Sequence, residues 1–216
     1  MRAPIVAALA VVVAAASGVL AARVAPAEEA PLSPASVATA VAPDVAAMGE
    51  AGAALLDGLR VDLPSPQAPG PDPYAPTPEL RYGQLEIPSI GLSQPFFEGV
   101  TLTAINRGPS HWPGTAMPGH LGNVVIAGHR TTHSRPFWDL DLVKPGDELI
   151  FTMLNGERYV YALDRVEVVD AGAVQIVEQG YGYTATLFGC HPKGSARQRI
   201  VGHFTLKSAP AVVSLG

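Results

Sequence analysis

Residues 79–208 are predicted to form an all-β fold with only short helical segments, and three features of the sequence predict it. Short apolar or alternating runs recur along this part of the chain, and Gly, Pro and Asn separate them. No segment with helical spacing exceeds about two turns. Many short strands at regular intervals are typical of a closed barrel or a sandwich, because each strand must bury one face.

The strands are predicted where apolar runs rich in Val, Ile, Thr and aromatic residues are bounded by turn signals. The runs that meet this description are residues 83–87, 94–98, 123–128, 148–154, 158–169, 184–189 and 200–207. Brief helical segments are predicted over residues 102–107, near residues 137–142 and over residues 174–179.

Residues 1–24 are predicted to form a signal anchor that crosses a membrane. Residues 5–22 are 18 consecutive residues without a charge, rich in Ala, Val and Leu, between Arg2 and Arg23. At about 1.5 Å per residue, this run is just long enough to cross a bilayer core. The positive charge of Arg2 favours a cytoplasmic N-terminus and places the remaining chain outside. The alternative is a cleavable signal peptide with its processing site near residues 19–21.

Residues 25–78 are predicted to be a disordered linker rich in Pro and Ala. They hold 11 of the 21 prolines, and seven acidic side chains against one basic side chain. Such a segment cannot bury enough apolar surface to offset the entropy of ordering it. Residues 79–208 carry 11 basic and 12 acidic side chains, so no basic surface indicates a nucleic-acid partner. Residues 209–216 form a short C-terminal tail.

Cys190 is the single cysteine, so the chain forms no intramolecular disulfide. It follows the predicted strand over residues 184–189, and His191 and a proline come next, where the chain must turn. His129 follows the apolar run over residues 123–128, and Arg199 opens the last apolar run. A lone cysteine can also be a buried core residue, and its neighbours must distinguish that alternative from a reactive thiol.

These three side chains have the properties that acyl transfer from a peptide requires. A thiolate attacks the carbonyl carbon, a proton donor serves the departing amine, and a cation or hydrogen-bond donor stabilises the oxyanion. Cys190 supplies the sulfur. His129 titrates near neutral pH and can act as the general acid, while Arg199 keeps its proton. The sequence therefore predicts Cys190, His129 and Arg199 as catalytic residues.

Five segments of the chain resemble the sortase family, and in particular the class E sortases of actinobacteria. They are spread over residues 80–207, which is nearly all of the predicted β domain. In one-letter code they read IPSIGL at 87–92, GPSHWPGT at 108–115, GNVVIAGHR at 122–130, TLFGCHP at 186–192 and SARQRIV at 195–201.

The resemblance implies a closed eight-stranded β-barrel whose active site holds Cys190, His129 and an arginine. Arg197 and Arg199 are both candidates for the arginine, and Arg199 is preferred because the arginine of the family directly precedes the last strand. The chain departs from the family at Gly189, where sortases usually carry a threonine. We expect the loss of this hydroxyl to remove a possible hydrogen bond to the thiolate or the substrate.

The resemblance implies a cysteine transpeptidase on the outer side of a bacterial plasma membrane, held by residues 5–22 as a single span. Its implied substrates are secreted proteins with an LPXTG-like or LAXTG-like C-terminal sorting signal, which is cleaved after the threonine through a thioester on Cys190. Its implied acceptor is a cell-wall precursor amine. Two alternatives stay open: a cell-wall cysteine peptidase that passes the thioester to water, and an envelope module with an inert cysteine.

Several residues near the motifs are candidates for substrate binding. His111 and Trp112 lie in a Gly- and Pro-rich loop and either wall the substrate groove or anchor the loop by packing. Arg130 either contacts the substrate or pairs with a surface carboxylate such as Asp139 or Asp141.

His191 and Arg197 are further candidates for substrate binding. Because consecutive residues of a strand face opposite sides, His191 is not expected to be the base that serves Cys190. Four histidines within residues 111–133 invite a metal interpretation, but they lack the tight paired spacing of zinc sites. We expect no metal ion and no cofactor.

Overall fold

The computed structural model describes residues 61–210. The predicted anchor over residues 1–24, much of the predicted linker and the end of the predicted tail therefore lie outside the described residues. No helix within residues 61–210 is both long and apolar enough to span a membrane.

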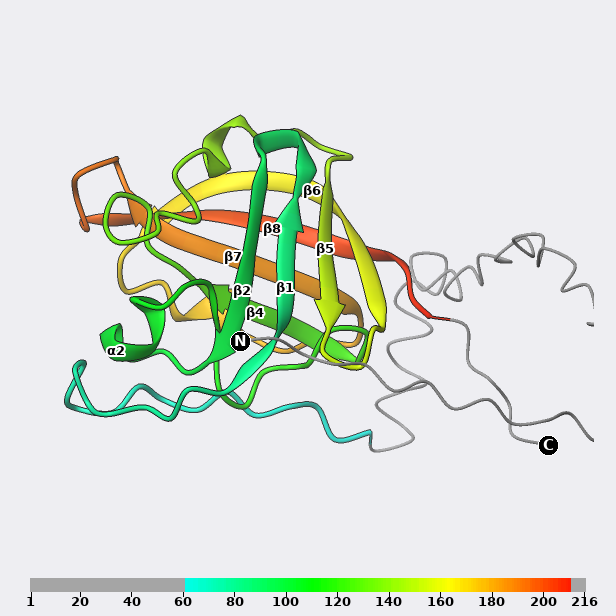
Figure 1. Cartoon of the computed structure of the whole chain (residues 1–216), viewed down its shortest axis with the longest axis horizontal. Coiled ribbons are helices and arrows are strands. Elements are labelled where there is room, and N and C mark those ends of the chain that lie inside the picture. The colour runs from blue at the N-terminus through cyan, green and yellow to red at the C-terminus, as the bar shows by residue number, and fades with distance from the viewer. Residues whose placement is uncertain (1–60, 211–216) are drawn as a thin grey trace, which may run out of the picture. The chain divides into compact units, whose positions relative to one another are not determined.

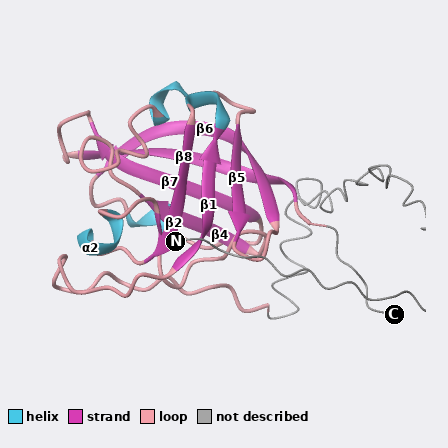
Figure 2. Cartoon of the chain, viewed as in Figure 1, coloured by secondary structure: helices cyan, strands magenta, loops and turns pink. Residues whose placement is uncertain are grey.

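Residues 61–210 form a closed barrel of eight strands with a few short helices. Figures 1 and 2 show the strands wrapped around one interior. Around the barrel the strands follow the order β1, β2, β3, β4, β7, β8, β6 and β5, and β5 pairs with β1 to close it. The elements are β1 (Arg81–Ile87), η2 (Pro88–Ile90), β2 (Leu92–Glu98), α2 (Leu102–Ile105), β3 (Ser110–His111), β4 (Gly122–Ala127), η3 (Leu140–Leu142), β5 (Glu148–Met153), β6 (Arg158–Asp170), η4 (Val174–Val177), β7 (Tyr183–His191) and β8 (Gln198–Ser208).

The closed eight-stranded barrel confirms the fold predicted for this part of the chain. Each of the predicted strands is present, with ends that differ from the prediction by one or two residues. The prediction missed β3, because a strand of two residues is too short to show an alternating pattern. Of the predicted helical segments, α2 is a single turn that Thr101 caps by accepting a hydrogen bond from the N–H of Ala104.

Two pairs of neighbouring strands, β2 with β3 and β4 with β7, run parallel, and the other pairs are antiparallel. In the β4–β7 pair, Gly122 lies opposite Tyr183 and Ala127 lies opposite Phe188. Parallel neighbours leave the sheet at the same end. The loops that follow β4 and β7 therefore begin side by side.

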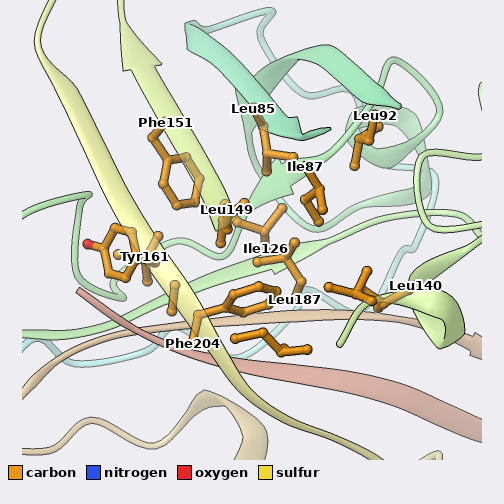
Figure 3. Packing of buried hydrophobic residues seen from close by; sticks show 14 of the residues in the cluster. Leu85, Ile87, Leu92, Ile126, Leu140, Leu149, Phe151, Tyr161, Leu187 and Phe204 are labelled. Atoms are coloured by element: carbon orange, nitrogen blue, oxygen red, sulfur yellow. The ribbon is translucent and has the colours of Figure 1, made fainter. Parts of the chain in front are cut away.

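The barrel interior is filled by apolar side chains that alternate along the strands. Figure 3 shows Leu85, Ile126, Phe151, Leu187 and Phe204 meeting inside the barrel, and each is at most 1% exposed. Burying a side chain of this kind stabilises the fold by roughly 1.5–3 kcal/mol. The core therefore holds β4 and β7, the two strands that lead to His129 and Cys190.

The segment between β4 and β5 packs against the ends of both strands and contributes two side chains to the core. Phe137 and Leu140 are fully buried. A Cβ atom at Gly128 would lie 2.5 Å from the Phe137 ring, and one at Gly189 would lie 3.1 Å from the carbonyl oxygen of Gly128. The close approach of this segment to β7 thus requires glycine at position 128, directly before His129.

The end of the predicted linker differs from the expectation, because residues 61–78 are bonded to the barrel. The N–H of Gln67 donates to Pro113 O at 2.9 Å, and the indole Nε1–H of Trp112 donates to Gln67 O at 2.8 Å. Nearer the barrel, a guanidinium N–H of Arg107 donates to Thr77 O at 2.8 Å. The low apolar content of residues 61–78 predicted disorder. These residues are instead placed by hydrogen bonds to their backbone groups, which an argument from buried hydrophobic area does not include.

Candidate active site

Cys190 lies near the end of β7 on the outer face of the barrel wall. Along β7 the residues Ala185, Leu187 and Gly189 are buried, whereas Phe188 and Cys190 are partly exposed. Because side chains alternate along a strand, the thiol and the Phe188 ring share the face opposite to the core. The thiol is therefore within reach of solvent and of a bound ligand.

Arg199 is the cross-strand partner of Cys190 in the β7–β8 register. Directly opposed residues of antiparallel strands lie on the same face, with Cβ atoms about 4.5–5.5 Å apart. Nη1 of Arg199 donates to the carbonyl oxygens of Ala196 at 2.8 Å and Gln198 at 2.9 Å. These two bonds hold the guanidinium at the β7–β8 loop and leave its other N–H groups for a ligand.

His129 comes level with Cys190 because β4 and β7 are parallel. The last paired residues of the ladder are Ala127 and Phe188, and the N–H of Gly128 donates to Phe188 O at 3.1 Å. Two residues beyond this pair, one chain reaches His129 and the other reaches Cys190. The register thus places residues 129 and 190 at corresponding points of two adjacent chain segments, each two residues beyond the last pair.

Two side chains fix the His129 ring. Its Nε2 lies 2.7 Å from Oδ1 of Asn106, the C-terminal cap of α2, and its ring stacks on His133 with centroids 4.7 Å apart. Burial lowers the pKa of His129, and the charge of His133 lowers that pKa further. The neutral ring donates its Nε2–H to Asn106, so Nδ1 carries the lone pair that can take a proton.

An apolar cavity of about 410 Å³ borders Arg199 and Phe188, and neither Cys190 nor His129 is among the residues that line it. Residues of η4, the Trp112 and Phe188 rings, and residues 66–69 line it, and Arg199 completes the wall. The two rings tilt against each other with centroids 6.1 Å apart. A cavity of this size with apolar walls and a cation at its edge suits a short peptide whose leading side chains are apolar.

His111 lies inside the barrel wall and does not line the cavity. It is 3% exposed, and its Nδ1 lies 2.7 Å from a carboxylate oxygen of Glu98. Its Nε2 lies 3.0 Å from the carbonyl oxygen of Ala116. Tyr82 meets the imidazole edge-on, and burial together with the Glu98 charge raises the pKa of Tyr82 to about 12. Of the two neighbours predicted to wall the groove, Trp112 faces the cavity and His111 anchors the loop.

Arg130 and His191 contact each other away from the cavity. Arg130 Nη1 lies 2.7 Å from His191 Nδ1, and Arg130 Nη2 lies 2.8 Å from Oδ1 of Asp141. The Arg130 side chain is 1% exposed. Arg130 therefore pairs with Asp141, one of the two carboxylates expected for it. The pair differs from a surface ion pair because the arginine side chain is buried and only the carboxylate is exposed.

Arg197 is exposed in the loop between β7 and β8, one residue before β8 begins, and its N–H donates to Ser195 Oγ at 3.3 Å. Of the two candidate arginines, Arg199 is therefore the one that is paired with Cys190 in the ladder. Within residues 61–210, no group of three or more His, Cys, Asp or Glu side chains has a geometry that could hold a metal ion.

A family model described as the Sortase domain matches residues 85–206, which is more than half of the chain and includes His129, Cys190 and Arg199. The chain belongs to the sortase family.

Two sortases illustrate the sequence similarity. The chain is 29% identical to Sortase D of Bacillus subtilis over 111 residues, which are 51% of the chain and 54% of that protein. It is also 29% identical to Sortase SrtE1, a class E sortase of Streptomyces coelicolor, over 140 residues, which are 57% of the chain and 40% of that protein. The aligned part thus spans about half the length of these sortases or less.

A solved sortase structure agrees with the barrel. A sortase D transpeptidase of Clostridium perfringens superposes with a TM-score of 0.53 at 29% identity, covering 58% of this chain and 78% of that one. Together with the family match, this supports the eight-stranded sortase barrel. The class E-like character expected from the motifs agrees with the match to the Streptomyces sortase.

Sequence reasoning missed several residues of this sortase site. Asn106 was read as part of a short helix, and nothing in its neighbourhood indicated that it bonds to His129. Phe188 was not singled out as a site residue, although its alternation with buried Leu187 places it on the same face of the strand as Cys190. The contribution of residues 66–69 to the cavity had no sequence signal, because it depends on where the linker runs.

The glycine that replaces the usual sortase threonine also differs from expectation in where it faces. A Cβ atom at Gly189 would lie 3.1 Å from Gly128 O, 3.5 Å from Phe137 Cβ and 3.6 Å from Arg130 Cβ. A hydroxyl at position 189 would therefore begin on the face opposite to the Cys190 thiol. The close packing of the β4–β5 segment on β7 gives a physical reason for glycine here.

Proposed function

We propose that this sortase is a membrane-anchored cysteine transpeptidase that cleaves a C-terminal sorting signal after its threonine and joins the protein to a cell-wall amine. One observation carries the proposal. Cys190 has Arg199 as its cross-strand partner, His129 lies two residues beyond the last pair of the parallel β4–β7 ladder, and Arg199 and Phe188 border an apolar cavity. The family membership and the resemblance of the motifs to class E sortases support the same reaction.

In the first half of the reaction, the Cys190 thiolate attacks the carbonyl carbon of the signal threonine. The oxyanion that forms is stabilised by N–H groups of Arg199, whose charge is retained throughout. His129, which takes the thiol proton of Cys190 on Nδ1 when the thiolate forms, gives this proton to the departing amine, and the carbon–nitrogen bond breaks. A thioester on Cys190 and a released C-terminal peptide result.

In the second half, an acceptor amine attacks the thioester carbonyl. Neutral His129 takes a proton from the attacking amine, the carbon–sulfur bond breaks, and the sulfur leaves as the thiolate. The new amide bond joins the two partners and restores the starting protonation of both residues. Asn106 keeps Nε2 as the protonated nitrogen, so the proton is exchanged at Nδ1 in both halves.

The cavity supports an apolar start of the sorting signal. Its walls of Trp112, Phe188, Val174, Ile176 and Val177 suit the Leu-Pro or Leu-Ala pair that precedes the cleaved position. Residues 5–22 support a position at the outer face of a plasma membrane, because an uncharged run of this length can span a bilayer.

The reaction is tested with the full chain in detergent, fluorogenic LAXTG and LPXTG peptides, and triglycine as the acceptor. We expect a ligated product that increases with triglycine, and a thioester on Cys190 by mass spectrometry. Cys190→Ala should retain the circular dichroism of the fold and form no product. Cleavage by water with no ligation would instead indicate a peptidase, and a thiol that is alkylated only after unfolding would indicate an inert module.

A further inference from the structure

The site described above has a second pair of side chains directly behind it. His129 is followed by Arg130, and Cys190 is followed by His191. His191 faces the side of β7 opposite to Cys190, as Gly189 does, and the Cβ position of Gly189 lies 3.6 Å from Arg130 Cβ. The Arg130–His191 pair therefore lies across the wall from the thiol. The 2.7 Å contact between Arg130 Nη1 and His191 Nδ1 joins the same two chain segments one residue further along.

The protonation of this contact follows from the chemistry of its partners. A guanidinium has N–H donors and no acceptor, so Nδ1 of His191 must accept and therefore carries no proton. The Arg130 charge is balanced by Asp141 at 2.8 Å, and Lys193 lies 3.6 Å from the same Asp141 oxygen. Although burial acts to raise the pKa of Asp141, its hydrogen bonds and the Arg130 and Lys193 charges hold that pKa below its usual range.

Gly128 and Gly189, which precede His129 and Cys190, have no side chains that could link the two segments. The Cβ position of Gly189 is only 3.1 Å from Gly128 O. The backbone bond from Gly128 to Phe188 ends the ladder between the segments. The Arg130–His191 contact is thus a side-chain link between the two segments, one residue beyond His129 and Cys190.

We infer that Arg130 and His191 are positioning residues that hold the Cys190 thiol in register with the His129 imidazole. This inference rests on the proposed function and adds to it two residues on the side of the wall opposite to the thiol. The 1% exposure of the Arg130 side chain excludes direct contact with a bound signal peptide. The contact from Arg130 to Asp141 anchors the segment between β4 and β5, and the contact to His191 ties that segment to β7.

The test compares His191→Ala with His191→Asn in the full chain. An Asn side chain places an acceptor oxygen near the position of Nδ1, whereas Ala removes the acceptor. We expect His191→Ala to lower kcat about 10- to 100-fold with KM within about twofold, because a misplacement near 1 Å costs a reaction about this much. His191→Asn should recover most of the loss.

A matched control is His203→Ala, which removes a histidine on neighbouring β8 that is paired with Glu167 at 2.7 Å. We expect this variant to keep the kcat of the wild-type chain. The rate of Cys190 alkylation by iodoacetamide against pH supplies a readout that needs no substrate. His191→Ala should move this pH profile, since the thiolate loses its alignment with His129, whereas His203→Ala and His191→Asn should leave it in place.

The inference is overturned if His191→Ala keeps both the wild-type kcat and the wild-type alkylation profile, or if His191→Asn restores neither. Should His191→Ala fail to fold, 15N NMR of the wild-type chain decides: His191 Nδ1 should show the shift of an unprotonated nitrogen, and a protonated Nδ1 refutes the contact. A wild-type chain that forms no ligated product would refute the proposed function alone, because alkylation and NMR still test the positioning role.

Discussion

Two loops of the barrel carry a histidine at the end of a short buried strand, and they place it in opposite settings. In the β3 loop, residues 110–116, His111 is 3% exposed and its two ring nitrogens lie within 3.0 Å of Glu98 and Ala116 oxygens. In the β4 loop, residues 128–133, His129 is partly exposed and its Nε2 is bonded to Asn106. Both ring nitrogens of His111 are engaged by oxygens of the protein, whereas His129 uses one nitrogen to fix its ring.

The comparison shows that hydrogen-bond partners, rather than residue type or strand position, distinguish a structural imidazole from one that is available for chemistry. An imidazole bonded through both nitrogens to acceptors cannot release a proton without losing a bond. An imidazole held through one nitrogen keeps its orientation and can exchange a proton at the other. The β3 loop therefore supports the wall of the cavity, and the β4 loop supplies the proposed acid.

The largest expected effect distinguishes the two histidines by activity. His129→Ala should lower the rate of peptide transfer by about 10²–10⁴-fold, because general acid catalysis contributes about this much. Its thermal midpoint should stay within a few degrees of the wild-type value. Initial rates of ligation and a circular dichroism melt measure the two quantities. Retention of more than a tenth of the wild-type rate would rule out His129 as the acid.

The second prediction concerns the stability of the β3 loop. His111→Ala should lower the free energy of unfolding by about 1–3 kcal/mol, because Glu98 and Ala116 O lose a buried partner. The folded fraction should keep kcat within a few-fold. Urea unfolding and kinetics on the same sample measure both. A loss of kcat as large as that of His129→Ala, without a loss of stability, would reverse the roles of the two loops.

A smaller effect is expected at the partner of His129. Asn106→Ala should lower kcat by about tenfold, since one net hydrogen bond of about 1–1.5 kcal/mol corresponds to that factor. Asn106→Asp keeps an acceptor oxygen in place and should keep kcat closer to the wild-type value. Equal rates for Asn106→Ala and the wild-type chain would show that this contact does not orient the ring.

The smallest expected change is a shift of the His129 pKa. Burial and the His133 charge both lower the pKa of His129, so His133→Asn should raise that pKa toward the ordinary value of about 6.5. An NMR titration of the His129 ring in both chains measures the change. A lower pKa in the variant would contradict the assigned causes.

The same shift affects stability with a defined sign. Because the folded state binds the His129 proton more weakly than the unfolded state, stability is fully present above about pH 6.5 and falls as the pH drops through the lower folded pKa. Unfolding in urea at several pH values measures this dependence. The decline should be smaller in His133→Asn than in the wild-type chain.

Much of the barrel could be predicted from the sequence because its strands bury alternating apolar faces. Leu187 between Thr186 and Phe188 is typical of such a strand. Alternation alone does not say whether the sheet closes into a barrel, and the resemblance to sortases implied that it does. β3 escaped prediction because its two residues are held by pairing with β2 and β4 rather than by a pattern of their own.

The candidate site was predictable for residues at strand ends and less so for residues that depend on packing. Cys190, His129 and Arg199 each adjoin an apolar run, so their convergence follows from strand register. His111 and Trp112 are neighbours in one loop, and the sequence could not tell which would be buried. The contact of Arg130 with His191 spans 61 residues and required the path of the β4–β5 segment.

The cysteine strand has neighbours on both sides, with β4 along one edge and β8 along the other. Its backbone N–H and C=O groups are thereby engaged up to Phe188 on one side and His191 on the other. An incoming peptide cannot dock here by extending the sheet as an added strand, in the manner of β-augmentation. Under the proposed function, selectivity among incoming peptides must then come from side chains outside the sheet. Trp112 and η4, which line the cavity, are therefore the places where we expect substrate choice to be re-engineered without altering the barrel.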